Sequence, residues 1–223
     1  MNLPNAITVG RILVAPLIAA LPFIASPIAR IAAFAAFIVA AVSDYLDGML
    51  ARSRNLETDL GRLLDPLADK LLLFATMIPM FVLMSPPTDW LAPGPDALDA
   101  AHRFPFETPF GRVGLPWWVL AIVLGRELFM TIFRQLAARR GVVIAAIGPA
   151  KWKTGFQWTW VGASYFWFFA STLATRYRWD TALWDAFAYL NAFVGLVSMV
   201  GAVFLTIYSL SLYMQRYGRV FAS

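Results

Sequence analysis

Six long apolar segments dominate this 223-residue chain and restrict what it can fold into. Each approaches or exceeds the roughly 20 mostly apolar residues that an α-helix needs to cross a bilayer. With 60% hydrophobic and 14% charged residues, the chain has too few polar side chains to cover a soluble domain. The sequence therefore predicts an all-α integral membrane protein with six transmembrane helices. Their expected ranges are 6–25, 27–50, 63–84, 116–138, 155–174 and 186–214.

The segments between these helices are short, apart from residues 85–115, which are rich in Pro and Gly. No internal repeat or low-complexity tract marks a separate soluble domain, so we expect one membrane domain over residues 1–223. The first segment contains Arg11 and has no basic residue before it, which disfavours a cleavable signal peptide. We expect it to be a retained helix.

Lys and Arg residues are distributed unequally between the two sides that six spans would create. One side carries Arg52, Arg54, Arg62, Arg139, Arg140, Lys151, Lys153, Arg216 and Arg219, and the other Arg30, Arg103, Arg112, Arg176 and Arg178. The positive-inside rule places the more basic side, with both termini, in the cytoplasm. The net charge of +5 suits anionic lipid head groups and gives no reason to expect nucleic acid binding. We expect a bacterial inner membrane protein.

Two other features are not expected to take part in chemistry. His102, the only histidine, lies in the long polar loop and is expected to be solvated. The fifth apolar segment is rich in aromatic residues, which suit lipid-facing and interfacial positions. These are Trp158, Trp160, Phe166, Trp167, Phe168 and Phe169.

Four carboxylates lie at the ends of the second and third expected helices, at Asp44, Asp47, Asp65 and Asp69. Ionisable groups at membrane depth are costly unless they pair, meet water or hold a cation. Helical spacing puts the members of each pair on one face, so two helices packed side by side would gather all four. Oxygen donors without His or Cys favour Mg²⁺ or Mn²⁺ over zinc. The sequence therefore predicts a divalent metal site at the cytoplasmic ends of these two helices.

The spacing of these residues is specific. Residues 44–69 read DYLDGMLARSRNLETDLGRLLDPLAD, which contains D-x-x-D-G-x-x-A-R, then eight residues, then G-x-x-x-D-x-x-x-D. This arrangement resembles the signature of the CDP-alcohol phosphatidyltransferase family at every fixed position. The resemblance implies a metal-dependent membrane transferase that acts on a CDP-linked lipid and forms homodimers.

Two further stretches resemble the phosphatidylglycerophosphate synthases of that family. They are the start NLPNAITVGR and the later Arg126-Glu127, Arg134 and G-x-x-K-x-K-T at 148–154. The resemblance implies transfer of a phosphatidyl group from CDP-diacylglycerol to glycerol 3-phosphate among membrane lipids, with release of CMP. It assigns Asp44, Asp47 and Asp65 to two divalent ions, and Asp69 to both the metals and the acceptance of the hydroxyl proton.

Other residues are expected to contact the CDP-lipid. Gly48 and Gly61 would leave room for the nucleotide to approach the backbone, although close helix packing is the alternative explanation of a glycine in a membrane helix. The flanking Asp47 and Ala51 favour the nucleotide at Gly48. Arg52 has a planar fork suited to phosphate or cytidine oxygens. Asn5, Thr8 and Thr58 are added by the resemblance alone.

The acceptor glycerol 3-phosphate is an anion, so its pocket should be basic. Arg126 and Arg134 are eight residues apart, about two helical turns, and therefore lie on roughly one face. Lys153, near the start of the fifth expected helix, would complete a grip on the phosphate, although it would also suit the membrane interface.

Two alternatives stay open at this point. The same chemistry would serve another alcohol acceptor, such as phosphatidylglycerol, inositol phosphate or serine. The carboxylates would also suit a divalent-cation transporter, although a transport path needs ligands near the middle of the bilayer. Product formation with different alcohols separates the acceptors, and metal flux without CMP release identifies a transporter.

Overall fold

The computed structural model describes residues 3–54, 59–86, 88, 89, 91, 92, 103–145 and 148–218, with the backbone alone for 3, 4, 45–54, 59, 60, 62 and 63. These residues form six α-helices, one short 3-10 helix and one β-hairpin. The elements are α1 (Leu3–Ala20), η1 (Leu21–Phe23), α2 (Pro27–Arg54), α3 (Asp59–Met84), β1 (Phe106–Thr108), β2 (Gly111–Val113), α4 (Trp117–Arg139), α5 (Gly148–Tyr177) and α6 (Ala182–Tyr217).

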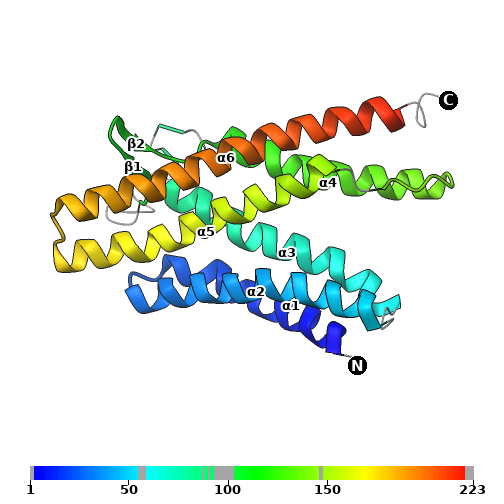
Figure 1. Cartoon of the computed structure of the whole chain (residues 1–223), viewed down its shortest axis with the longest axis horizontal. Helices are drawn as coiled ribbons and strands as arrows, with labels where there is room; N and C mark the ends of the chain where they lie inside the picture. Colours follow the sequence, from blue (N-terminus) through cyan, green and yellow to red (C-terminus); the bar gives the residue numbers. More distant parts are fainter. Residues whose placement is uncertain are drawn as a thin grey trace.

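The helices form an elongated bundle, with their axes close to its long direction (Figure 1). α1 and α3 begin, and α2, α4 and α6 end, in the right half of that view. The α1–α2 and α5–α6 turns lie in the opposite half. α5 packs against both α2 and α6, and α1 packs against both α2 and α3.

Each expected span corresponds to one observed helix, and most of the helices extend past the expected ends. Four stretches are long and apolar enough to cross a membrane by length and composition: Asn5–Phe23, Pro27–Asp44, Leu64–Met84 and Ala182–Tyr217. The chain is thus an integral membrane protein. α4 and α5 are not among these four, and both carry charged side chains within their length, including Arg126, Glu127 and Lys153.

The sequence predicts lipid-facing and interfacial positions for the aromatic residues of α5, and the structure differs for three of them. Trp160, Trp167 and Phe168 are at most 1% exposed. The prediction is wrong for these three because α5 is covered by α2 on one side and by α6 on the other. The Trp167 ring stacks on Trp184 of α6 with centroids 5.7 Å apart. Its Nε1 donates a 3.0 Å hydrogen bond to the carbonyl oxygen of Pro105.

Tyr165 joins three helices at the centre of the bundle. Its side chain is buried, and its hydroxyl lies 3.2 Å from the carbonyl oxygens of both Ile18 on α1 and Ala75 on α3. A polar group in an apolar interior is costly unless it finds a hydrogen-bond partner. The hydroxyl therefore stabilises the position of α5 against α1 and α3.

The long loop contains a short β-hairpin that the all-α prediction missed. β1 pairs with β2 in antiparallel register, Phe106 opposite Val113. Phe106 packs on Gly195 of α6, where a Cβ atom would come within 2.4 Å of the phenyl ring. Three-residue strands in a Pro- and Gly-rich loop are too short to produce a recognisable alternation. His102 lies outside the described residues.

Candidate functional site

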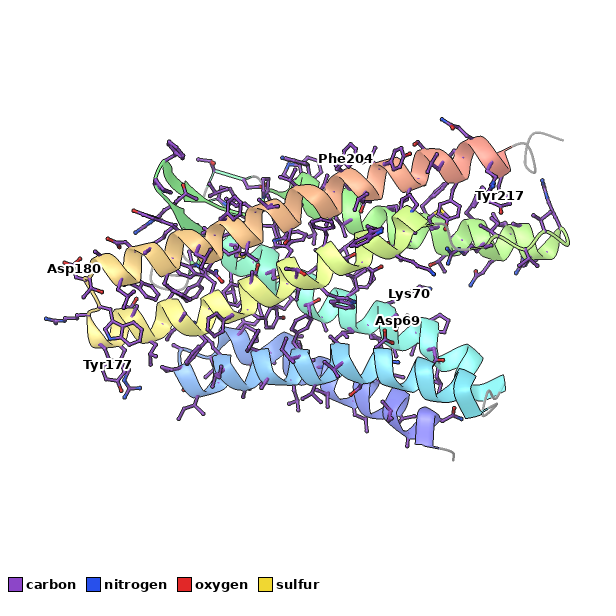
Figure 2. The ribbon with its side chains drawn as sticks, viewed as in Figure 1. Asp69, Lys70, Tyr177, Asp180, Phe204 and Tyr217 are labelled. Atoms are coloured by element: carbon purple, nitrogen blue, oxygen red, sulfur yellow. The ribbon has the colours of Figure 1, made fainter. Side chains whose placement is uncertain are left out.

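Arg11 links two of the predicted carboxylates. It is only 4% exposed, although it lies within the apolar α1. Its Nη1 donates to Oδ1 of Asp44 on α2 and, at 3.1 Å, to Oδ1 of Asp69 on α3. Figure 2 labels Asp69 on α3, in the half of the bundle where α1 begins. One guanidinium therefore holds together acidic side chains from two different helices.

The third carboxylate is held by the same helix. Thr8 Oγ1 donates a 2.9 Å hydrogen bond to Oδ1 of Asp65. Asn5, Thr8 and Arg11 follow each other at intervals of three residues, so they share one face of α1. All three are buried. α1 therefore presents a polar face, and hydrogen bonds join its Thr8 and Arg11 to carboxylates.

The sequence predicted that the second and third helices pack side by side and gather the carboxylates. This prediction is incomplete because it left out α1. In the described residues, α1 packs against both α2 and α3 and supplies the side chains that bind Asp44, Asp65 and Asp69. The side chains of Asp47 and Arg52, and the whole of Thr58, lie outside the described part of the chain, and Gly48 is described by its backbone alone. Gly61 is described and is buried.

Carboxylate oxygens are donors of the kind that hard cations prefer. The side chains of Asp44 and Asp69 are 39% and 55% exposed, so both carboxylates reach the surface of the bundle. Among the side chains that the structure describes, no group of three or more His, Cys, Asp or Glu residues is arranged to hold a metal ion. The described carboxylates contact a guanidinium and a hydroxyl, which are a cation and a neutral donor.

Sequence reasoning assigned no bond to Arg11. The signal was present, because a charged residue inside a membrane span is expected to pair with an opposite charge. The three-residue spacing of Asn5, Thr8 and Arg11 pointed to a single buried face. What the sequence lacked was the position of α1 between the two acidic helices.

A second polar cluster joins α4, α5 and α6, and it contains the predicted acceptor residues. Glu127 Oε1 accepts hydrogen bonds from Arg126 Nη1 at 2.9 Å and from Lys153 Nζ. Arg126 and Lys153 are buried, at 7% and 4% exposure. Arg126 Nη2 also donates to Ser209 Oγ of α6 at 3.2 Å. Two cations thus share one carboxylate inside the bundle.

Tyr213 of α6 brings the third predicted cation to the same cluster. Its ring is fully buried, and the guanidinium carbons of Arg126 and Arg134 lie 5.9 and 5.7 Å from the ring centroid. Arg134 Nη2 donates to the Tyr213 hydroxyl at 3.3 Å. The structure therefore gathers Arg126, Arg134 and Lys153, with three positive charges against the one negative charge of Glu127.

An apolar groove of about 560 Å³ lies between α2, α5 and α6. On α2, its lining residues Phe34, Phe37 and Ala41 precede Asp44 at helical spacings, and Ala41 is less than one turn from that carboxylate. On α5, Gly162 contributes to the opposite wall. The groove therefore follows the same face of α2 that carries one of the predicted metal ligands.

Comparison with known proteins adds a family assignment to this geometry. A family model described as CDP-alcohol phosphatidyltransferase matches residues 1–208. The chain is 32% identical over 197 residues to the CDP-diacylglycerol–glycerol-3-phosphate 3-phosphatidyltransferase of Bacillus subtilis, covering 83% of this chain and 87% of that protein.

Two plant proteins are also similar. One is CDP-diacylglycerol–glycerol-3-phosphate 3-phosphatidyltransferase 1, chloroplastic/mitochondrial, from Arabidopsis thaliana, 33% identical over 71% of this chain and 49% of that protein. The other is cardiolipin synthase (CMP-forming) from Oryza sativa subsp. japonica, 31% identical over 71% of this chain and 44% of that protein. The chain thus matches less than half of the length of each plant relative.

Proposed function

The chain belongs to the CDP-alcohol phosphatidyltransferase family, and we propose that it transfers a phosphatidyl group from CDP-diacylglycerol to sn-glycerol 3-phosphate, releasing CMP. The observation that carries this proposal is the presence of two polar clusters in one helical bundle. The first offers carboxylates for a metal-bound diphosphate, and the second offers cations for a phosphorylated alcohol. The names of the Bacillus and Arabidopsis relatives support the same reaction.

The oxygen-only donor set fits divalent metal ions, which the family generally requires. Asp44, Asp47, Asp65 and Asp69 would hold two ions, Mg²⁺ or Mn²⁺. When bound, such ions neutralise a diphosphate and stabilise the leaving nucleotide. The exposure of the Asp44 and Asp69 side chains supports this role, because a substrate can reach them from outside the bundle.

The residues of the chain would then act on the acceptor alcohol. Asp69 accepts the proton of the acceptor hydroxyl while the hydroxyl oxygen forms a bond to the β-phosphorus of the CDP-lipid. The β-phosphorus is the one that carries the diacylglycerol. The bond between that phosphorus and the oxygen that leaves with CMP breaks, so the charge stays balanced. General-base catalysis of this kind contributes about 10²- to 10⁴-fold. Asn5, Thr8, Gly48, Arg52, Thr58 and Gly61 are proposed to position the CDP-lipid.

Arg126, Arg134 and Lys153 are proposed to bind the phosphate of glycerol 3-phosphate. The excess of positive charge in their cluster supports this assignment, since Glu127 offsets only one of the three cations. Tyr213 keeps the two arginines on one ring, which limits the rotamers that they have to give up on binding.

The apolar groove is proposed to hold an acyl chain of the CDP-lipid. A lipid whose diphosphate sits at Asp44 must direct its chains toward the bilayer interior. The groove offers that path along Ala41, Phe37 and Phe34 of α2. Gly162 on α5 leaves room for the chain in the groove, because it has no side chain.

The position of the protein in the membrane belongs to the same proposal. We take all six helices as spans of one domain over residues 1–223, with the metal site at the cytoplasmic ends of α2 and α3. α1 and α3 begin, and α2, α4 and α6 end, in the same half of the bundle, which supports this arrangement (Figure 1). The excess of Lys and Arg on that side supports a cytoplasmic active site in a bacterial inner membrane. A homodimer is proposed from the family resemblance.

The rice relative gives a reason to keep a second acceptor in view, because its name describes a cardiolipin synthase. The test is formation of radiolabelled product from CDP-diacylglycerol by the purified chain, with a panel of alcohols, with and without chelator. Metal-dependent product with glycerol 3-phosphate supports the proposal. Turnover only with phosphatidylglycerol, or another acceptor, would contradict it.

A further inference from the structure

We propose that Arg11 is a positioning residue, a buried cation that fixes Asp44 and Asp69 in place before any divalent ion binds. The inference rests on the proposed function, because it takes these two carboxylates as metal ligands. It goes beyond that function by giving a role to a residue of α1 that is not itself an oxygen donor. The role is to make the metal site pre-organised.

The geometry separates an inner and an outer side of the cluster. The Arg11 side chain is 3% exposed, whereas those of Asp44 and Asp69 are 39% and 55% exposed. The same nitrogen, Nη1, donates to one oxygen, Oδ1, of each carboxylate. The guanidinium therefore approaches from inside the bundle, while the carboxylates extend toward the surface.

Charge explains why this arrangement matters. Two carboxylates drawn to one nitrogen repel each other, and that repulsion favours protonation or separation. The carboxylates in turn stabilise the Arg11 cation, since a charge inside an apolar helix needs an opposite charge nearby. The guanidinium thus stabilises both carboxylates and is stabilised by them, and the same contacts join α1 to α2 and α3.

The position of the guanidinium beneath the carboxylates distinguishes support from competition. A competitor for the metal would occupy the outer, solvent-facing side of Asp44 and Asp69. Arg11 instead holds them from the buried side, as partners of metal ligands commonly do, and loss of such a partner typically costs 10- to 100-fold in metal affinity. We therefore expect removal of Arg11 to weaken metal binding.

The test is Mn²⁺ binding to the full chain in detergent, measured by electron paramagnetic resonance of the unbound ion. Arg11→Gln is expected to bind Mn²⁺ about 10- to 100-fold more weakly than the natural chain. Arg11→Lys keeps the charge but loses the planar fork, so an intermediate affinity is expected. Thermal unfolding with chelator and with Mn²⁺ is measured in parallel for each variant.

Arg30 supplies a matched control in the same bundle. It is equally buried, at 2% exposure, but it donates to the Pro22 carbonyl at 3.0 Å and to the Thr172 hydroxyl. Its guanidinium lies 4.3 Å from the Phe104 ring centroid. Arg30→Gln is expected to lower the melting temperature while leaving Mn²⁺ affinity unchanged, because its contacts lie at the opposite end of α2.

Three results would overturn the inference. They are equal or tighter Mn²⁺ binding by Arg11→Gln, an equal loss of affinity in Arg30→Gln, and no Mn²⁺ binding by the natural chain. If Arg11→Gln does not fold, Arg11→Lys decides, and unchanged affinity in that variant would sink the idea. A chain that shows the expected affinities but makes no product from glycerol 3-phosphate would contradict the proposed reaction and leave the role of Arg11 standing.

Discussion

The hydroxyl of Thr8 on α1 donates a hydrogen bond of 2.9 Å to Oδ1 of Asp65 on α3, 57 residues further along the chain. The bond shows that α1 contributes a side chain to the carboxylate site. Together with the contacts of Arg11, it shows that one polar face in an apolar helix binds acidic residues of both neighbouring helices.

Thr8→Val removes the hydroxyl from Asp65 and keeps the shape of the side chain. A hydrogen bond to a charged group contributes about 1.5–3 kcal/mol, so we expect roughly a tenfold or greater loss of Mn²⁺ affinity. Thr8→Ser keeps the hydroxyl and serves as the control. Titration of Mn²⁺ against each variant checks this, and a Thr8→Val chain with natural affinity would contradict the proposed support of Asp65.

Asp69→Asn removes the proposed base while changing few atoms. We expect turnover to fall by about 10²-fold or more, with CDP-lipid binding largely retained. The measurement is product formation beside binding of labelled CDP-diacylglycerol. Asp180→Asn, an exposed acid at the far end of the bundle, is the control and should be as active as the natural chain (Figure 2). Near-normal turnover in Asp69→Asn would rule out the assignment.

Arg126→Gln removes one cation from the cluster on α4, α5 and α6. We expect the KM for glycerol 3-phosphate to rise about tenfold or more, because a hydrogen bond to a charged phosphate is lost. The KM for CDP-diacylglycerol should change little. Arg176→Gln, at the opposite end of α5, is the control. Equal increases in both KM values would place Arg126 outside the acceptor pocket.

Gly162→Leu fills the apolar groove. A Cβ atom at this position would lie 3.6 Å from Phe37, an ordinary contact, so the helix can accept the side chain. We expect a several-fold higher KM for long-chain CDP-diacylglycerol and little change for a short-chain analogue. Gly155→Leu on the same helix is the matched control, since a Cβ atom there has no neighbour within 4 Å. The same effect on both substrates would argue against an acyl-chain site.

Tyr165→Phe deletes the hydroxyl that lies between α1 and α3. Losing this hydrogen bond should lower the free energy of unfolding by about 1 kcal/mol. A chain of this size would then melt roughly 2–4 °C lower. Thermal unfolding in detergent measures the change, with Tyr208→Phe on the exposed face of α6 as the control. An unchanged melting temperature would show that the hydroxyl does not stabilise the bundle.

Much of the candidate site was visible in the order of residues. The spacing predicted that Asp44 and Asp47 share one helical face and Asp65 and Asp69 another, and the family assignment agrees with the signature that contains these residues. The side chain of Asp47 lies outside the described residues, so the first pair stays a prediction. Arg126 and Arg134 were predicted to share a face, and they do contact the same Tyr213 ring. The shared face of Arg126 and Arg134 could be predicted because it depends on helical periodicity, which is local along the chain.

Other features were out of reach of local patterns. The buried position of Trp160 and Trp167 depends on α5 lying between α2 and α6, and nothing in the composition of α5 states which neighbours cover it. The pairing of Lys153 with Glu127 likewise joins two helices. The hairpin at Phe106 has strands too short for a periodic signal.

The amino-acid order alone determined that this protein lies in a membrane, roughly where each helix runs, and the family signature, since apolar length and residue spacing are properties of short segments. Only the tertiary structure decided that α1 stands against both acidic helices and that Arg11 is the cation between Asp44 and Asp69. Packing in a membrane bundle depends on the fit of side chains from distant segments, and no single segment carries that information.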